Sequence, residues 1–466
     1  MRLFAVLSVL GFCIVSVLFL INPSPVTIKG ILLYVGLIFF LFAKEKYLIY
    51  ISMFMVLCPV HLRYVGTTSN GIILILALIL LFRSLVSQKS ILSFKRITTN
   101  PFFIPGLLIL CSYFISWIWA FLEHYKGMSY HTEFLISMFC VFILSNIIIG
   151  FVDSKAHLLG IQNILLVILI VNLLFAIATL IKPELKFILL STSGSVITGG
   201  EDLRLGGLTF RWEAFAEYLM MSVVFFTCML TKGKDIKYKY LLLTLLFVVV
   251  IELFLTNTRG AVVTSLLGIV FIILFFTKFN PIRKTAIMVG ISFLVLAGAY
   301  IADSTGFLNL KERFQTFENT VETKYGSMPE ARAGTWVPSL DQIVDDSFMG
   351  HGPSFHPLSG YEGGFGKMPW PHNLTLIILV TVGIYGLIAY CFLFFRFLIS
   401  IIKITKITDK YSAIFYKSLW IALLMFFVDA QKFDGALRQS TSYFYFIWMI
   451  VALLFTSYNI ALNNQN

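Results

Sequence analysis

His372 lies between Pro371 and Asn373, at the point where a long polar stretch gives way to an apolar segment. The proline restricts the backbone, so the imidazole is held where the chain enters that segment. An imidazole can take a proton from a hydroxyl group near neutral pH. His372 is therefore our candidate catalytic base. The alternative is a histidine that only bonds to a neighbour at a membrane surface.

Four arginines are our candidates for holding an anionic group. Arg259 lies in a very short polar turn between two apolar segments, Arg204 and Arg211 flank the start of another, and Arg332 lies in the long polar stretch. Arginine binds phosphate groups through two parallel hydrogen bonds. The alternatives are side chains that anchor a helix at the membrane surface and, for Arg332, stacking on Trp336.

Glu213 and Glu217 are spaced for one helical face just after Arg211. Carboxylates are favoured near a helix N-terminus by its dipole, which is the ordinary interpretation of this pair. The other interpretation is contact with the hydroxyl groups of an acceptor, for which Asn373 is a third candidate. His351 and His356 lie in a Gly- and Pro-rich passage with too few ligands nearby, so no metal site is expected.

Membrane helices must position these residues. The chain has 466 residues, of which 59% are hydrophobic and 12% charged, against about 25% charged in a soluble protein. We therefore expect one all-α polytopic membrane domain over residues 1–466, with about 14 (12–14) spans of roughly 20 apolar residues each. The segments are 3–21, 26–43, 46–60, 70–86, 102–122, 131–150, 157–181, 211–230, 239–255, 260–277, 284–302, 373–400, 411–430 and 440–461.

The basic residues predict the orientation, because loops on the cytoplasmic side of a membrane are rich in Lys and Arg. With the N-terminus inside, the inner loops carry +16 and the outer side −4, which together give the net charge of +12. Both termini are then cytoplasmic, and every candidate residue above faces outward. The positive charge is thus a topology signal, and nucleic-acid binding is not expected because no soluble basic face exists.

The longest outer loop is predicted over residues 303–371. Apolar spacing predicts one helix over 308–324 and a second over 330–345, followed by an irregular Gly- and Pro-rich passage, 350–371. The apolar face of the second helix is expected to hold Trp336, Val337, Leu340 and Val344.

Four short motifs follow one another over roughly residues 195–400. They are Arg204-Leu205-Gly206-Gly207, Asn257-Thr258-Arg259-Gly260-Ala261, Arg332 to Trp336 followed by Gly350-His351-Gly352, and His372-Asn373 followed by Gly383-Ile384-Tyr385-Gly386. In this order the motifs resemble those of the bacterial O-antigen ligase and O-antigen/exopolysaccharide polymerase superfamily. The stretch after Gly207 lacks the Asn-Pro often seen there, which leaves both Arg204 and Arg211 open as the functional arginine.

The resemblance implies a GT-C-like membrane glycosyltransferase of the bacterial inner membrane, without metal or cofactor. Its donor would be an oligosaccharide on undecaprenyl diphosphate, and its acceptor a hydroxyl of lipid A-core in a ligase or of the growing glycan in a polymerase. Arginines matching Arg204, Arg259 and Arg332 would hold the diphosphate, and His372 would be the base of an inverting transfer. The expected number of spans favours a polymerase.

Two other functions remain open from the sequence. One is a protein O-glycan ligase, which shares the same donor chemistry. The other is a flippase for lipid-linked glycans or another transporter, which would carry charged residues deep within its helices. Besides its substrates and the lipid bilayer, the expected partners are other proteins of polysaccharide assembly.

Overall fold

The computed structural model describes residues 93–124, 127–182, 205–209, 212–232, 239–256, 258–277, 279–287, 319–346, 348–354, 371–404, 411–431 and 442–463, with single positions at 50, 289, 290, 293 and 300. Apart from residue 50, the four segments expected between residues 3 and 86 lie outside this description, as does most of the segment expected over 284–302, so the expected total of about fourteen spans stays a prediction. All structural statements below concern the described residues.

Eight described helices are long and apolar enough to cross a membrane. They are α6 (Phe103–Leu122), α7 (Met128–Phe151), α8 (Lys155–Ile181), α10 (Trp212–Lys232), α12 (Arg259–Phe271) with its π-helical continuation η3 (Ile272–Phe276), α16 (Leu374–Ile404), α17 (Tyr411–Asp429) and α18 (Ser442–Asn463). The apolar helix α11 (Lys239–Leu255) is slightly shorter, with 17 residues. Each coincides with a predicted segment, which confirms a helical, polytopic membrane protein.

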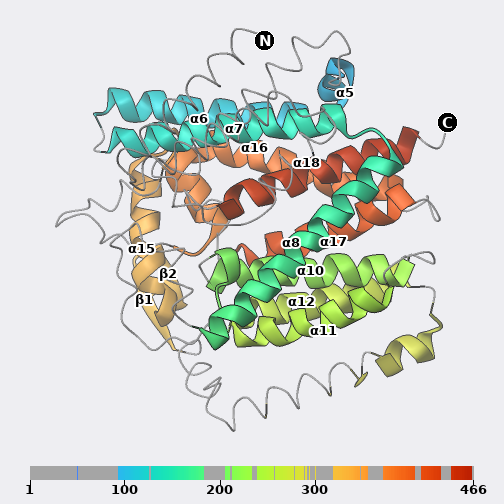
Figure 1. The fold of residues 1–466 in the computed structure, drawn as a ribbon. Coiled ribbons are helices and arrows are strands. Elements are labelled where there is room, and N and C mark those ends of the chain that lie inside the picture. The colour runs from blue at the N-terminus through green and yellow to red at the C-terminus, as the bar shows by residue number, and fades with distance from the viewer. Residues whose placement is uncertain are drawn as a thin grey trace, which may run out of the picture.

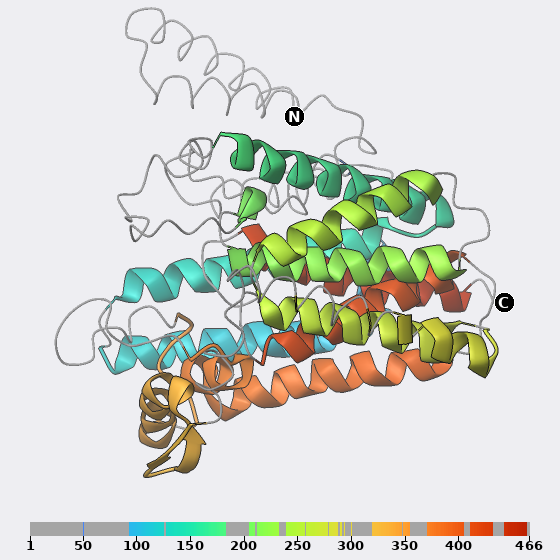
Figure 2. The same ribbon diagram turned by 90° about the horizontal axis from the view of Figure 1, so that it is seen from below.

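The helices form one bundle, drawn in Figure 1 with α6, α7 and α16 on one side and α10, α11 and α12 on the other. Helices α17 and α18 pack between these groups, and α18 is the most buried span of the described part. Helix α8 crosses the bundle obliquely. Figure 2 shows the same bundle turned by 90°, with a small group of elements at one end. We call that end the loop end.

The loop-end elements are an antiparallel hairpin, β1 (Thr320–Thr323) and β2 (Gly326–Pro329), followed directly by α15 (Glu330–Asp345). The helix predicted over 330–345 is confirmed at both bounds. The helix predicted over 308–324 is wrong where it is described, because 320–323 is a strand. β-Branched residues favour a strand there, and Gly326, with φ of +98°, permits the tight turn.

The hairpin is fastened to α15 by Asp341. Its carboxylate lies 2.6 Å from Nζ of Lys324 and accepts a hydrogen bond of 2.6 Å from the hydroxyl of Tyr325. The hydrogen bond from Lys324 lowers the pKa of Asp341, and the bond to Asp341 raises the pKa of Tyr325. The expected apolar face of α15 is only partly correct, since Val344 is 68% exposed.

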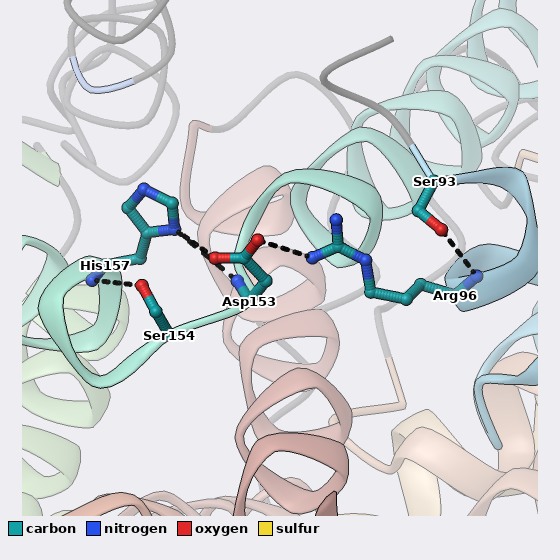
Figure 3. A network of polar contacts seen from close by, with 5 residues as sticks. All are labelled: Ser93, Arg96, Asp153, Ser154 and His157. Atoms are coloured by element: carbon teal, nitrogen blue, oxygen red, sulfur yellow. Dashed lines mark hydrogen bonds and ion pairs between the residues drawn. The ribbon is translucent and has the colours of Figure 1, made fainter.

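A second polar network fastens the opposite end of the bundle (Figure 3). Asp153, in the α7–α8 turn, lies 3.2 Å from the guanidinium of Arg96 on the short helix α5 (Phe94–Thr99) and 3.0 Å from Nδ1 of His157. Ser93 and Ser154 accept hydrogen bonds from backbone N–H groups at the starts of α5 and α8. These partly exposed pairs contribute about 0–1 kcal/mol each and fix the direction of the turn.

Helix α16 is broken at Gly383, where φ is +63° and ψ is −162°. A left-handed backbone is strained for any residue with a Cβ. A Cβ at this position would also lie 2.1 Å from the carbonyl oxygen of Phe348, so the chain after α15 approaches the broken helix closely. This contact brings the long loop onto the bundle.

We expect Gly383→Ala to destabilise the folded protein by at least about 2 kcal/mol, because the added Cβ meets both backbone strain and the Phe348 carbonyl. The measurement is the thermal midpoint of the purified protein in detergent. Gly290→Ala is the matched control, since a Cβ at Gly290 meets nothing within 4 Å. Equal midpoints for the two variants would contradict the proposed role of the break.

Candidate active site at the loop end

His372 is the residue immediately before the cap of α16, and its backbone is left-handed, with φ of +49°. This conformation costs a residue other than glycine about 1–2 kcal/mol. Such strain persists where the surroundings determine the backbone, and it is frequent at functional sites. The side chain of His372 is partly exposed at the loop end, while Pro371 before it is buried.

Asn373 holds the start of α16 in place. Its Oδ1 accepts a 3.0 Å hydrogen bond from the N–H of Leu376, which makes it the cap of the helix. Its Nδ2 donates to the carbonyl oxygen of Gln431 at 3.1 Å, and the N–H of Leu374 donates to Ala430 at 3.0 Å. The structure thus gives Asn373 a structural role, and its contact with an acceptor stays a prediction.

Helix α15 contacts the chain just before His372. The indole N–H of Trp336 donates to the carbonyl oxygen of Pro371 at 2.9 Å. Arg332 lies one turn earlier on α15 and is half-buried. Residues four apart on a helix lie on one face, so Arg332 and Trp336 face the same side of α15. The candidate base and one candidate phosphate-binding arginine are therefore brought into one region.

The motif at residues 350–352 has a structural task at the break in α16. The N–H of His351 donates to the carbonyl oxygen of Val380 at 2.8 Å. The hydroxyl of Ser116 donates to the carbonyl oxygen of Thr381 at 2.6 Å. The N–H of Gly352 donates in turn to Ser116 Oγ at 3.1 Å. A break in a helix leaves carbonyl groups without their usual partners. The loop and Ser116 supply donors to two of the carbonyl groups at this break.

Two histidines hold this loop. His351 Nε2 lies 2.9 Å from the carbonyl oxygen of Gln342 on α15. His131, fully buried on α7, accepts a 3.1 Å hydrogen bond at Nδ1 from the N–H of Ser354. His131 is not among the candidate residues named from the sequence. The only available signal was its position at the loop end of a span, because its partner lies far along the chain.

The glycine at position 352 is explained by His131. Gly352 has φ of +105°, and a Cβ there would lie 2.3 Å from the imidazole ring of His131. The ring therefore packs directly on the backbone of the loop. The described residues contain no group of three or more His, Cys, Asp and Glu side chains arranged to hold a metal ion.

Arg259 belongs to a second group at the loop end. It is the first residue of α12, it is half-buried, and it follows a turn in which Thr256 Oγ1 accepts the N–H of Thr258 at 3.3 Å. On the neighbouring helix α17, the last residue, Asp429, is buried and accepts a 3.0 Å bond from Thr264 of α12. The turn and this bond position Arg259 at the end of the bundle.

Three glutamates lie toward the loop end of helices α10 and α11. Glu217 of α10 and Glu252 of α11 are buried within two turns of the loop end, and Glu213 lies half-buried in the first turn of α10. For Glu213 this position fits the helix-dipole interpretation. Glu217 lies deeper than that interpretation requires. Contact of either glutamate with an acceptor stays a prediction.

Arg204 and Arg211 lie outside the described residues, so the choice between them stays open. The intervening turn is described: η2 (Gly207–Thr209) is buried, and the N–H of Leu208 donates to Asn172 of α8 at 3.2 Å. Gly207 has φ of +50°, and a Cβ there would lie 2.5 Å from the ring of Phe215. This turn is therefore fixed between α8 and α10.

The fold and this end of the bundle define a multi-pass membrane protein with a loop anchored on its helices. Residues 240–391 match the protein family described as O-antigen ligase. The matched range includes Arg259, α15 and His372, and it confirms the resemblance to the O-antigen ligase and polymerase superfamily. No curated protein matches the chain.

We expect Asn373→Ala to lower stability by about 0.5–2 kcal/mol, because the variant loses the helix cap and the bond to Gln431. Thr375→Val is the matched control, since it removes only the exposed 3.0 Å bond from Thr375 to the Gln431 side chain. Thermal midpoints in detergent compare the two. A loss no larger in Asn373→Ala than in Thr375→Val would refute the capping role.

Proposed function

We propose that the protein is a membrane glycosyltransferase of O-antigen or other surface-polysaccharide assembly. It transfers a glycan from undecaprenyl diphosphate to an acceptor hydroxyl at the periplasmic face of the bacterial inner membrane. The observation that carries this proposal is the contact of Trp336 with Pro371, which joins the helix of Arg332 to the residue before His372. Arg332 and His372 both lie within the range that matches the O-antigen ligase family.

In the proposed reaction, the acceptor oxygen attacks C1 of the donor sugar, and the diphosphate leaves from the opposite face. His372 takes the proton of the acceptor hydroxyl as the new bond forms. Arg259 and Arg332, with Arg204 or Arg211, bind the diphosphate and offset the charge that builds up on its oxygen atoms. Attack in one step inverts the anomeric centre. The proposed role of the arginines requires no metal ion.

Three kinds of enzyme fit this proposal, and they differ in their acceptor. The acceptor is lipid A-core for a ligase, the growing glycan for a polymerase, and a protein hydroxyl for a protein ligase. The superfamily contains both ligases and polymerases, and the expected fourteen spans favour a polymerase. In a strain without the gene, single translocated repeat units would indicate a lost polymerase, and full-length unattached glycan a lost ligase. Accumulation on the cytoplasmic face would indicate a flippase instead.

The predicted catalytic residues are tested by His372→Ala and Arg259→Ala. We expect each to lower the rate of glycan transfer by about 100-fold or more, since a general base alone contributes 10²–10⁴-fold. Transfer is measured with purified full-length protein, undecaprenyl-diphosphate-linked oligosaccharide and the candidate acceptors. His124→Ala and Arg283→Ala are the controls, because His124 lies in the α6–α7 turn and Arg283 in the helical residues 281–287, and neither belongs to the proposed site. Full transfer by both site variants would reject the mechanism.

The orientation gives a separate prediction. If the loop end faces the periplasm, alkaline phosphatase fused after residue 363 is active, and green fluorescent protein fused after residue 466 is fluorescent. Alkaline phosphatase folds only in the oxidising periplasm, where its disulfides form. An inactive phosphatase fusion together with a dark C-terminal fusion would show the opposite orientation and place the candidate site in the cytoplasm.

A further inference from the structure

We propose that Trp336 is a positioning residue of the transfer reaction, which holds His372 at a fixed place relative to Arg332 through its hydrogen bond to Pro371. This inference rests on the proposed function, because it concerns how the candidate base is placed. It adds to that function a side chain that touches neither the donor nor the acceptor in the mechanism above.

The first step of the argument is the hydrogen bond itself. Trp336 Nε1 donates to the carbonyl oxygen of Pro371 at 2.9 Å. This carbonyl belongs to the peptide group that enters His372, so its direction limits the backbone of His372. Two backbone hydrogen bonds at the start of α16 do not involve Pro371: the N–H of Leu374 donates to the carbonyl oxygen of Ala430, and the N–H of Ile377 to that of Asn373.

The second step is the strain at His372. A left-handed residue reverts to an ordinary conformation unless the residues on both sides are fixed. On the C-terminal side, Asn373 is fixed by Leu376 and Gln431. On the N-terminal side, the bond from Trp336 fixes Pro371. Loss of this bond releases one side of the strained residue, which gives the imidazole freedom to move.

The third step is the connection to the arginine. Four residues along a helix correspond to a rise of about 6 Å, so the backbone of α15 sets the separation of Arg332 and Trp336. The C-terminal part of α15 is held separately, by His351 on Gln342 and by the indole of Trp119 on Asp346. The C-terminal end of α15 is thus held independently of Trp336, and the side chain of Trp336 connects His372 to the helix that carries Arg332.

The chain provides a matched control for this role. Trp448 of α18 is buried, whereas Trp336 is half-buried, and the indole N–H of Trp448 has no hydrogen-bond partner in the described part of the protein. Trp448→Phe therefore makes the same change of side chain without removing a hydrogen bond. Any effect that follows from the smaller ring alone appears in both variants.

The kinetic test compares Trp336→Phe with Trp448→Phe in the full-length protein. We expect Trp336→Phe to lower kcat by about 10-fold to 100-fold, since a misplacement of 1 Å costs about 100-fold, while KM for the lipid-linked donor stays within about twofold. We also expect a change in the shape of the rise of kcat with pH, because this rise follows the deprotonation of the base. A loss of active protein would scale the whole profile without changing its shape.

The structural test uses protein with ¹⁵N-labelled histidine rings, in which His372→Ala identifies the signals of His372. We expect these signals to shift in Trp336→Phe and to stay in place in Trp448→Phe. Unchanged His372 signals and an unchanged pH profile in Trp336→Phe would overturn the proposal. If that variant does not fold, benzothienylalanine at position 336 keeps the shape of the indole and replaces only its N–H with sulfur.

The variants His372→Ala and Trp336→Phe together distinguish a failure of this inference from a failure of the proposed function. If His372→Ala transfers glycan at the full rate, His372 is not the base and the proposed mechanism fails. The positioning role proposed for Trp336 is then rejected as well, because His372 would not be the base that it positions. If His372→Ala is inactive while Trp336→Phe keeps the full kcat, the mechanism stands and only the positioning role is rejected.

Discussion

The break in α16 is the constraint on which the loop end depends. In an apolar medium, the carbonyl groups that a broken helix releases must find donors within the protein. Here the N–H of His351 and the hydroxyl of Ser116 bond to the carbonyl groups of Val380 and Thr381. The close approach of the loop is possible only because Gly383 has no Cβ. Docking of the loop places α15 against α16, and α15 contacts the residue before the candidate base.

The candidate site consequently has two parts, which are held in place by different contacts. One part is α15 with the start of α16, where Trp336 and Asn373 fix the chain on either side of His372. The other part is the end of the helices α10, α11, α12 and α17, where Arg259 follows a tight turn and Asp429 bonds to Thr264. Under the proposed mechanism, Arg259 in the second part and Arg332 in the first bind the diphosphate, while His372 acts on the acceptor.

The sequence predicts the described spans well, because a membrane helix needs a long apolar run and such a run is visible residue by residue. The bounds of α15 also follow from local signals, with Pro329 before it and an apolar face within it. The β1–β2 hairpin was not predicted, since its short strands depend on pairing between Val321 and Met328. Two contacts at the loop end, His131 with Ser354 and Ser116 with Thr381, join residues more than two hundred positions apart, which no local pattern reveals.

The left-handed backbone of His372 has a consequence for how this position tolerates change. Glycine is the residue that adopts such a conformation most easily, so the fold alone would prefer glycine there. Histidine at this position carries about 1–2 kcal/mol of backbone strain. Under the proposed mechanism, selection for stability and selection for activity act in opposite directions at this position, and a glycine at 372 would combine a more relaxed fold with the loss of the imidazole.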